Sequence, residues 1–222
     1  MSRQFHDRIE AGQLLALELA RYAHRPDVLV LGLPRGGVVV ASEVARQLGA
    51  PLDIFLVRKL GTPHNEELAL GAIASGGVRV LNGELVERLG ISDEMIDAIA
   101  GREQLELERR ERAYRGHRPP VDVEGKIVLL IDDGIATGAT MHAVVDALRQ
   151  QGPAKIVVAV PTAAASSLEE FRAEADEVVA VIAPTDFYGV GQWYENFTQT
   201  TDEEVCELLD RAQRTEVGRP TG

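Results

Sequence analysis

Short, almost wholly apolar runs alternate along the chain with longer segments in which apolar residues recur at helical spacing. The apolar runs are rich in Val, Ile and Leu, as expected for strands covered on both faces of a parallel sheet. They occupy residues 27–33, 52–58, 126–131, 156–160 and 177–182. The helical patterns occupy residues 10–22, 38–48, 84–115, 141–151 and 166–175. This alternation predicts the α/β class, with a doubly wound, mostly parallel sheet of about five strands flanked by helices.

Three parts of the chain carry other patterns. Residues 60–68 are polar and contain Gly and Pro, which predicts a loop. Residues 69–74 and 78–81 predict a hairpin with a Gly-Gly turn between its strands. The mixed charges of residues 103–115 are typical of a solvated helix with ion pairs at i,i+4 spacing.

Composition and charge narrow the function classes. The 222 residues are 45% hydrophobic and 26% charged, which is typical of a soluble globular protein long enough to bury a core. The formal net charge is −12, and residues 166–217 alone contain 13 acidic and 3 basic side chains. Because phosphate contacts along a nucleic acid need a basic face, we expect no nucleic-acid partner.

Cysteine content and the first residues indicate the compartment. Cys206 is the single cysteine, which excludes an intrachain disulfide and a Cys-based zinc site and favours a reducing compartment. The start of the chain lacks the pattern of a secretion signal, and Pro34 and Arg35 interrupt the apolar stretch over residues 28–40. We therefore expect a cytoplasmic protein with no membrane-spanning segment.

The turn after the strand at 126–131 combines acids with a candidate phosphate site. Its small and hydroxyl residues open a helix, so backbone N–H groups can approach an anion at the positive helix end. These residues are Thr137, Gly138, Ala139 and Thr140. Asp132 and Asp133 precede them and would accept hydrogen bonds from hydroxyls, so a ribose 5-phosphate fits the spacing. The turn is not a Walker A loop, because Ala139 stands where the lysine belongs. A plain strand-to-helix turn with an aspartate N-cap is the alternative.

The turn after the first strand offers a second anion site. Pro34, Arg35, Gly36 and Gly37 combine a permanent cation with glycines that allow close backbone approach. Taken alone, this sequence would be an ordinary tight turn with an exposed arginine. Together with the first turn, it predicts a substrate that has a phosphate at one end and a pyrophosphate at the other.

Arg58 and Lys59 stand where the predicted loop begins. The chain has only three lysines, so a lysine at this place suits a mobile lid whose cations close on a leaving anion. As an isolated pair, they would more often be solvated surface.

Residues 128–140 resemble the phosphoribosyl pyrophosphate (PRPP) motif of the type I phosphoribosyltransferases. The resemblance implies that Asp132 and Asp133 hold the ribose hydroxyls, and that the segment from Ala136 to Thr140 holds the 5′-phosphate. Residues 34–37 are similar to the pyrophosphate loop of the family, in which a cis peptide is common. Residues 58–70 fall where the family has its mobile catalytic loop.

The family core corresponds to residues 27–183, within a single domain over residues 1–222. The resemblance then makes residues 84–118 a helical insertion and residues 184–222 a C-terminal hood and tail. The loop pattern R-K-L-G-x-P followed by E-L-A-x-G-A is similar to that of a bacterial phosphoribosyltransferase-like branch, which gives Glu67 a catalytic role.

Two further positions concern the acceptor base. Phe187 lies in a segment similar to the base-binding hood of purine enzymes and would stack on the base, unless it is a core aromatic under the C-terminal loop. Enzymes for 6-oxopurines have an acid where this chain has Ala136. Because adenine-type enzymes are similar to this chain there, hypoxanthine and guanine are disfavoured.

We therefore expect a glycosyltransferase that moves the 5-phosphoribosyl group between PRPP and a nucleobase, with release of pyrophosphate, in nucleotide salvage. Loss of pyrophosphate builds an oxocarbenium-like ribose and an anionic leaving group, so acids must face the ribose and cations must face the leaving pyrophosphate. The candidate catalytic residues are Arg35, Arg58, Lys59, Glu67, Asp132 and Asp133. Mg²⁺ is expected as a bridge held mainly by substrate oxygens, loop closure would exclude water, and the family often forms homodimers.

Two other functions fit the same residues. One is a non-catalytic sensor that binds PRPP and regulates a partner or an RNA, although the acidity counts against RNA. The other is a pyrophosphokinase that makes PRPP. That class usually has a second homologous half, and the sequence contains no internal repeat.

Overall fold

A computed structural model describes residues 4–62, 65–116, 118–120 and 122–217. Five parallel strands form its main sheet, in the order β2-β1-β6-β7-β8. The strands are β1 (Val28–Gly32), β2 (Leu52–Ile54), β6 (Ile127–Ile131), β7 (Lys155–Thr162) and β8 (Glu177–Ile182). The predicted α/β class and the parallel sheet of five strands are confirmed.

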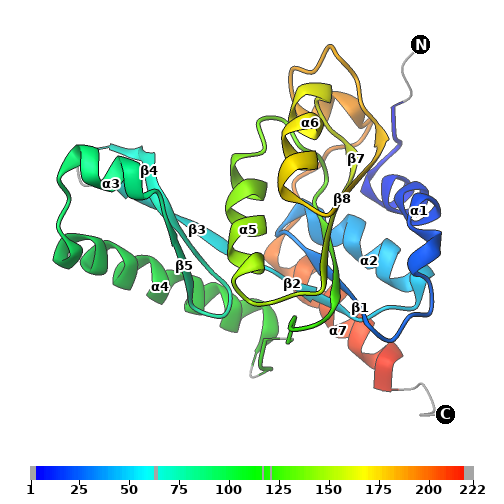
Figure 1. Cartoon of the computed structure of the whole chain (residues 1–222). Coiled ribbons are helices and arrows are strands. Elements are labelled where there is room, and N and C mark those ends of the chain that lie inside the picture. Colours follow the sequence, from blue (N-terminus) through cyan, green and yellow to red (C-terminus); the bar gives the residue numbers. More distant parts are fainter. Residues whose placement is uncertain (1–3, 63–64, 117, 121, 218–222) are drawn as a thin grey trace.

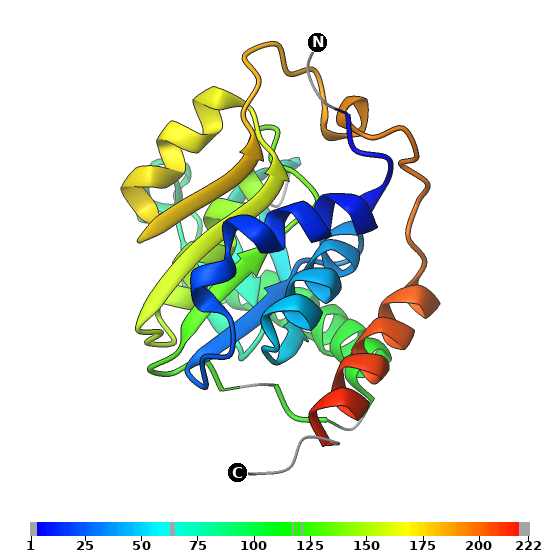
Figure 2. The same cartoon turned by 90° about the vertical axis from the view of Figure 1, so that its right-hand side faces the viewer.

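Helices cover both faces of this sheet. One face carries α1 (Arg8–Glu18), α2 (Gly36–Leu48) and α7 (Asp202–Val217), and the other carries α5 (Ala139–Arg149) and α6 (Ala165–Glu174) (Figures 1 and 2). Short 3-10 turns are η1 (Ala20–Tyr22) and η2 (Val190–Trp193). Alternate strand residues point to opposite faces, so Val28 and Val30 pack under α1 and α2 while Leu29 and Leu31 pack under α5. This explains why the strands appear in the sequence as uninterrupted apolar runs.

A second, antiparallel sheet projects from the main one. It consists of β3 (Val57–Thr62), β4 (Asn65–Ala74) and β5 (Val78–Leu81), and α3 (Gly83–Leu89) and α4 (Asp93–Arg115) pack against it (Figure 1). The predicted hairpin of residues 69–74 and 78–81 is confirmed as β4 and β5.

Two predictions around this sheet were wrong. The backbone of residues 60–68 was expected to be a loop, but its described part lies in β3 and β4. Leu60 is 1% exposed and packs on the projecting helices, which holds this polar segment in strand conformation. The strand register shifts at Gly61, and such an irregularity accommodates the sequence that resembled a loop. The predicted strand over residues 52–58 is two strands in two sheets, because the chain leaves the main sheet after Ile54.

The helix predicted over residues 84–115 is also two helices. Gly90 ends α3 with a left-handed φ of 62°, a conformation that glycine adopts without strain. Ser92 then begins α4 as its N-cap, with its Oγ accepting a hydrogen bond from the Met95 N–H at 3.4 Å. The break lets α4 return from the end of the projection to the main sheet (Figure 1).

The carboxyl end of α4 is fixed to the main sheet by a buried ion pair. Arg115 Nε donates to Asp53 Oδ1 at 2.9 Å, and Arg115 Nη2 donates to the Ile54 carbonyl oxygen at 2.6 Å. The Arg115 side chain is 5% exposed. Within the described residues, no helix combines the length and the apolar character needed to cross a membrane.

Candidate active site

The two turns that the sequence singled out meet at one edge of the main sheet. Strands β1 and β6 are parallel neighbours, so the turns at their carboxyl ends lie side by side, and Leu33 N donates to the Ile131 carbonyl oxygen at 2.9 Å. A Cβ at Gly36 would overlap the Asp133 carboxylate, and one at Gly37 would lie 2.8 Å from Asp132 Cα. The glycines therefore permit the close approach of the first turn to the acid pair. The peptide bond between Pro34 and Arg35 is cis.

The second acid of the pair is held by residues from both ends of the chain. Arg8 Nε on α1 donates to Asp133 Oδ2 at 2.8 Å, and Tyr194 Oη donates to the Asp133 carbonyl oxygen at 2.5 Å. Arg8 Nη1 donates to the Thr198 carbonyl oxygen at 2.8 Å, and the guanidinium lies 3.9 Å from the centre of the Phe197 ring. The Arg8 and Asp133 side chains are only 11% and 16% exposed. This ion pair is therefore well shielded from water.

Burial makes the ionised acid pair costly. Loss of solvent raises the pKa of Asp132 well above its ordinary value, and the neighbouring charge of Asp133 raises it further. Burial also raises the pKa of Asp133, while Arg8 acts against that change. A hydrogen bond from the Asp133 N–H to Asp132 Oδ1, at 2.8 Å, favours the charged form of Asp132. Arg8 is thus the cation that favours ionisation of the pair, and hydroxyl groups of a ligand would add further donors.

Two long helices start at this edge without a side-chain cap. Helix α5 begins after Gly138, whose φ is 74°, and α2 begins after Arg35, with no side-chain hydrogen bond to either helix start. Helix α6 also lacks one, whereas α1, α3 and α4 are capped by side-chain oxygens. The first N–H groups of a helix have no intrahelical acceptor, so the starts of α5 and α2 can donate to an anion.

The loop before α5 is fixed by its neighbours. Ser167 Oγ donates to the Ala136 carbonyl oxygen at 2.5 Å. A Cβ at Gly138 would lie 2.6 Å from the Phe171 ring, so only glycine fits there. Ala136, Thr137, Ala139 and Thr140 are exposed at the sheet edge. The segment that the sequence assigned to the 5′-phosphate is therefore rigidly placed and open to a ligand.

A cavity of about 320 Å³ lies between the first turn and α4. Three arginines line it, Arg35 from the turn and Arg109 and Arg110 from α4, together with the carboxylate of Asp202. Asp202 Oδ1 accepts a hydrogen bond from Tyr114 Oη at 2.5 Å and lies 4.0 Å from Arg35 Nη1. The other lining residues are Leu33, Pro34, Phe55, Leu56, Val57, Ala113, Tyr114 and Thr140.

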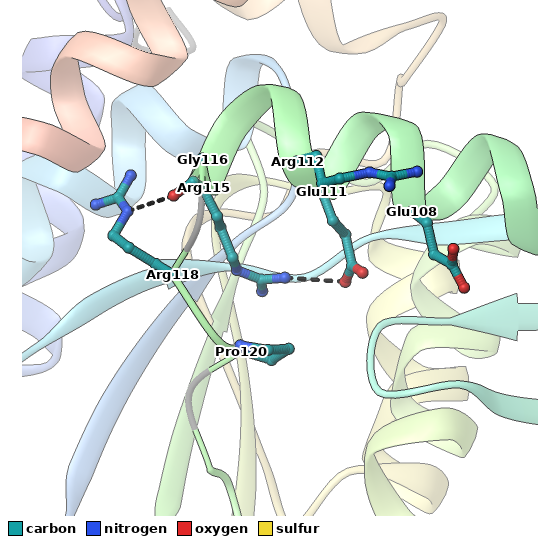
Figure 3. Close-up of a pocket in the computed structure, with 7 residues that line it drawn as sticks. All are labelled: Glu108, Glu111, Arg112, Arg115, Gly116, Arg118 and Pro120. Atoms are coloured by element: carbon teal, nitrogen blue, oxygen red, sulfur yellow. Dashed lines mark hydrogen bonds and ion pairs between the residues drawn. The ribbon is translucent and has the colours of Figure 1, made fainter.

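A smaller cavity of about 180 Å³ lies at the carboxyl end of α4 (Figure 3). Arg115 crosses its wall, and Arg115 Nη1 donates to Glu111 Oε1 at 2.9 Å. Arg118 Nε donates to the Arg115 carbonyl oxygen at 2.7 Å. This cavity is therefore lined by Arg115, which fixes the end of α4 to β2, and by Arg118, which bonds to that end. We assign it a structural role in attaching α4 to the main sheet.

The two cations of β3, Arg58 and Lys59, do not line the larger cavity. Arg58 on β3 donates from Nε to Glu103 Oε2 of α4 at 2.6 Å, and Lys59 is exposed on the same strand. The side chain of Glu67 lies outside the described residues. The Phe187 ring lies 6.1 Å from the Trp193 ring, centre to centre, and packs on a small cluster that includes Phe5. The catalytic roles of Arg58, Lys59 and Glu67 and the stacking role of Phe187 stay predictions.

The sequence interpretation missed four side chains near the site. Arg8 and Tyr194 are distant from the acid pair along the chain, so no local pattern connects them to it. Arg109 and Arg110 lie in the segment interpreted as a solvated helix, and both do pair with Glu106, at 2.7 and 3.0 Å. The only sequence feature that could have indicated an anion site on this helix was that the two arginines are consecutive, which places two cations close together.

Known proteins resemble the chain over most of its length. The family described as the phosphoribosyl transferase domain matches residues 4–196. A Mycobacterium tuberculosis protein named as a candidate phosphoribosyl transferase is 48% identical over 210 residues, which cover 95% of this chain and 47% of that protein. The chain thus spans about half the length of that relative.

A second curated relative and one crystal structure extend the comparison. The bifunctional protein PyrR of Listeria monocytogenes is 36% identical over 134 residues, which cover 55% of this chain and 72% of that protein. The crystal structure of a Thermus thermophilus protein is 46% identical and superimposes with a TM-score of 0.82, covering 93% of this chain and 97% of that one. The fold described above is therefore shared with that protein over nearly its whole length.

Proposed function

The chain belongs to the phosphoribosyl transferase domain family, and on this premise we propose that it transfers the 5-phosphoribosyl group between PRPP and a nitrogenous base. The bond between ribose C1 and the diphosphate oxygen breaks, a bond from C1 to a base nitrogen forms, the proton of that nitrogen is released, and pyrophosphate leaves. The observation that carries the proposal is the position of the acid pair, Asp132 and Asp133, beside the uncapped start of α5 at the carboxyl edge of the sheet.

Each end of PRPP has a counterpart at this edge. The carboxylates of Asp132 and Asp133 accept hydrogen bonds from the ribose 2- and 3-hydroxyls, and the N–H groups at the start of α5 bind the 5′-phosphate. The start of α2 and the Arg35 guanidinium face the diphosphate. The negative acid pair also stabilises positive charge as it develops on the ribose, because such interactions are strong where water is excluded.

Mg²⁺ is the metal that the family uses with PRPP. Among the described residues, no group of three or more His, Cys, Asp or Glu side chains could hold a metal ion. Mg²⁺ keeps several waters and is commonly bound by substrate phosphates with one or two carboxylates. We propose that it is held mainly by PRPP oxygens beside the acid pair, where it would neutralise charge on the diphosphate.

The acceptor is proposed to be a purine of the adenine type. Ala136 has a methyl group at the position where enzymes for 6-oxopurines have an acid that serves as general base for N7. The chain therefore supplies no carboxylate there for a 6-oxopurine. Phe187 is the candidate aromatic for stacking. Homodimer formation, nucleotide salvage and a cytoplasmic location remain parts of the proposal.

PRPP binding without transfer is a second candidate, and the position of Arg58 favours it. Arg58 on β3 pairs with Glu103 on α4, so in the described structure its guanidinium is not presented to the diphosphate. A sensor would bind PRPP tightly and release no pyrophosphate with any base.

A pyrophosphate-release assay with PRPP, Mg²⁺ and a panel of purines and pyrimidines separates the candidates. Transfer predicts release that depends on adenine or a related base and that Asp133→Ala abolishes. Glu124→Ala, which alters an exposed carboxylate before β6, at the end of that strand opposite to the acid pair, should retain full activity. Release that persists unchanged in Asp133→Ala would contradict the ribose assignment, and the absence of release with every base would favour the sensor.

A further inference from the structure

The larger cavity has a charge pattern that the proposed roles of the two turns do not explain. It contains three arginines and one carboxylate, on two walls that belong to different parts of the chain. Arg35 comes from the turn after β1, and Arg109 and Arg110 come from α4, the helix of the projection. Cations on facing walls repel each other, so a cavity that gathers them is suited to an anion of high charge.

Helix α4 presents its two arginines from a fixed position. Arg115 is tied to Asp53 and to the Ile54 carbonyl oxygen of β2, and Leu107 and Tyr114 are buried in the main core at 0% and 7% exposure. The helix turns that carry Arg109 and Arg110 are thus packed on the same body as the β1 turn. A cation held this way needs no lid movement to reach the cavity.

The two guanidinium groups are nevertheless free to exchange partners. Arg109 and Arg110 are 66% and 48% exposed, and their shared partner Glu106 sits on the helix surface. Exposed ion pairs of this kind contribute little to stability, so an anion in the cavity can compete for both groups. A guanidinium donates paired hydrogen bonds to phosphate oxygens, which a diphosphate can accept from more than one arginine.

Arg58 and Lys59, the cations expected from the sequence, are less well placed. Arg58 is bonded to Glu103, and neither residue lines the cavity. The cations that line the cavity beside Arg35 are therefore Arg109 and Arg110 of α4.

We propose that Arg109 and Arg110 of α4, together with Arg35, bind the diphosphate group of PRPP and the pyrophosphate product. This inference rests on the proposed function and assigns its leaving-group site to α4. Asp202 has the opposite effect in the same cavity. Its carboxylate lies 4.0 Å from Arg35 Nη1, so it balances that cation when no anion is bound and repels an incoming diphosphate.

Calorimetric titration of the whole chain with pyrophosphate and with PRPP, each with Mg²⁺, tests the assignment. The double variant R109Q/R110Q should bind both ligands at least about tenfold more weakly, because hydrogen bonds to charged groups are lost. R102Q is the matched control, since Arg102 is an exposed arginine of the same helix outside the cavity lining. D202N should bind pyrophosphate more tightly than the unmodified chain, and its amide oxygen can still accept the Tyr114 hydrogen bond.

The possible outcomes distinguish a failure of the diphosphate-site assignment from a failure of the proposed phosphoribosyl transfer. Binding by R109Q/R110Q within about twofold of the unmodified chain would overturn the inference, and so would a loss confined to R58Q/K59Q. Normal far-UV circular dichroism of the double variant shows that a loss of binding is not a loss of fold. If the unmodified chain binds neither ligand, the proposed function fails and the inference with it. If it binds both and only R109Q/R110Q is weakened, but no base causes turnover, the diphosphate site stands and transfer fails.

Discussion

The Asp133 carboxylate accepts a hydrogen bond from Arg8, which the chain places 125 positions earlier and which favours its ionised form. Because Arg8 Nε donates to the Asp133 carboxylate, we expect Arg8 to act as a positioning residue for that carboxylate. Neither Arg8 nor Tyr194 could be predicted from sequence, because their relation to the acid pair exists only after α1 and the C-terminal segment have packed on the sheet edge. The acid pair itself was predictable, because two carboxylates and a small-residue turn follow one another without a gap.

Replacing Arg8 by glutamine should weaken PRPP binding in a pH-dependent way. Asp133 would remain buried beside Asp132 without its cation, so the pKa of its carboxyl would rise further and less of it would be ionised at neutral pH. We expect PRPP affinity to fall about tenfold at neutral pH and to recover as the pH rises. Calorimetric titrations at several pH values from about pH 6 to about pH 9 measure this recovery of affinity.

A purely structural role for Arg8 would give a different profile. In that case the affinity of R8Q would be lowered by the same factor at every pH. R21Q, which alters an arginine near the end of α1 and far from the acid pair, should behave as the unmodified chain does.

Asp132→Asn should stabilise the fold while it removes activity. The folded-state pKa of Asp132 is raised above its ordinary value of 3.8, so the folded chain holds this proton to higher pH than the unfolded chain. The carboxylate therefore costs stability as the pH rises above that value, and the cost is absent below it. The variant should therefore be more stable than the unmodified chain at neutral pH and should unfold at a higher Tm.

Thermal unfolding of D132N at several pH values measures this effect. The gain should shrink as the pH falls toward the ordinary aspartate pKa. Asp186→Asn, a change at an exposed aspartate, supplies the comparison and should leave Tm unchanged. A lower Tm for D132N at neutral pH would mean that the acid pair contributes to stability instead of reducing it.

At the scale of secondary-structure elements, the sequence-based prediction was most accurate for segments whose residues all share one environment. Strands β1 and β6 are buried on both faces, so their residues are apolar throughout and their positions were found. The described part of residues 60–68 was missed as strand because its sequence is polar and contains Gly and Pro, while tertiary packing of Leu60 decides its conformation. The charge pattern of α4 did indicate a solvated helix, but it could not show that one side of that helix faces a cavity.

Arg115→Met should destabilise the chain by about 3–5 kcal/mol, because it removes one partner of the buried ion pair between Arg115 and Asp53. The two side chains are 5% and 9% exposed, so water cannot replace the lost partner. Urea unfolding measures the free-energy difference. R112M, at an exposed position on the last turn of the same helix, should change it by less than about 0.5 kcal/mol. Equal stability of the two variants would show that the pair does not anchor α4.

For the whole molecule, the acidic net charge and an anionic substrate are compatible because the charges are separated along the chain. Residues 166–217 hold 13 of the 35 acidic side chains and only 3 of the 23 basic ones. The arginines of the larger cavity come from the β1 turn and from α4, and screening by salt confines the effect of distant surface acids. The affinity for a small phosphorylated ligand is therefore set locally, by groups within a few ångströms of it.

The central claim is that PRPP binds across the joined turns, with its ribose on the acid pair. Calorimetric titration of the unmodified chain with PRPP and Mg²⁺, repeated with Asp133→Ala, tests this claim most directly. We expect one PRPP bound per chain, competition by ribose 5-phosphate, and loss of binding in Asp133→Ala. No heat of binding in the unmodified chain, or equal affinity in Asp133→Ala, would contradict it.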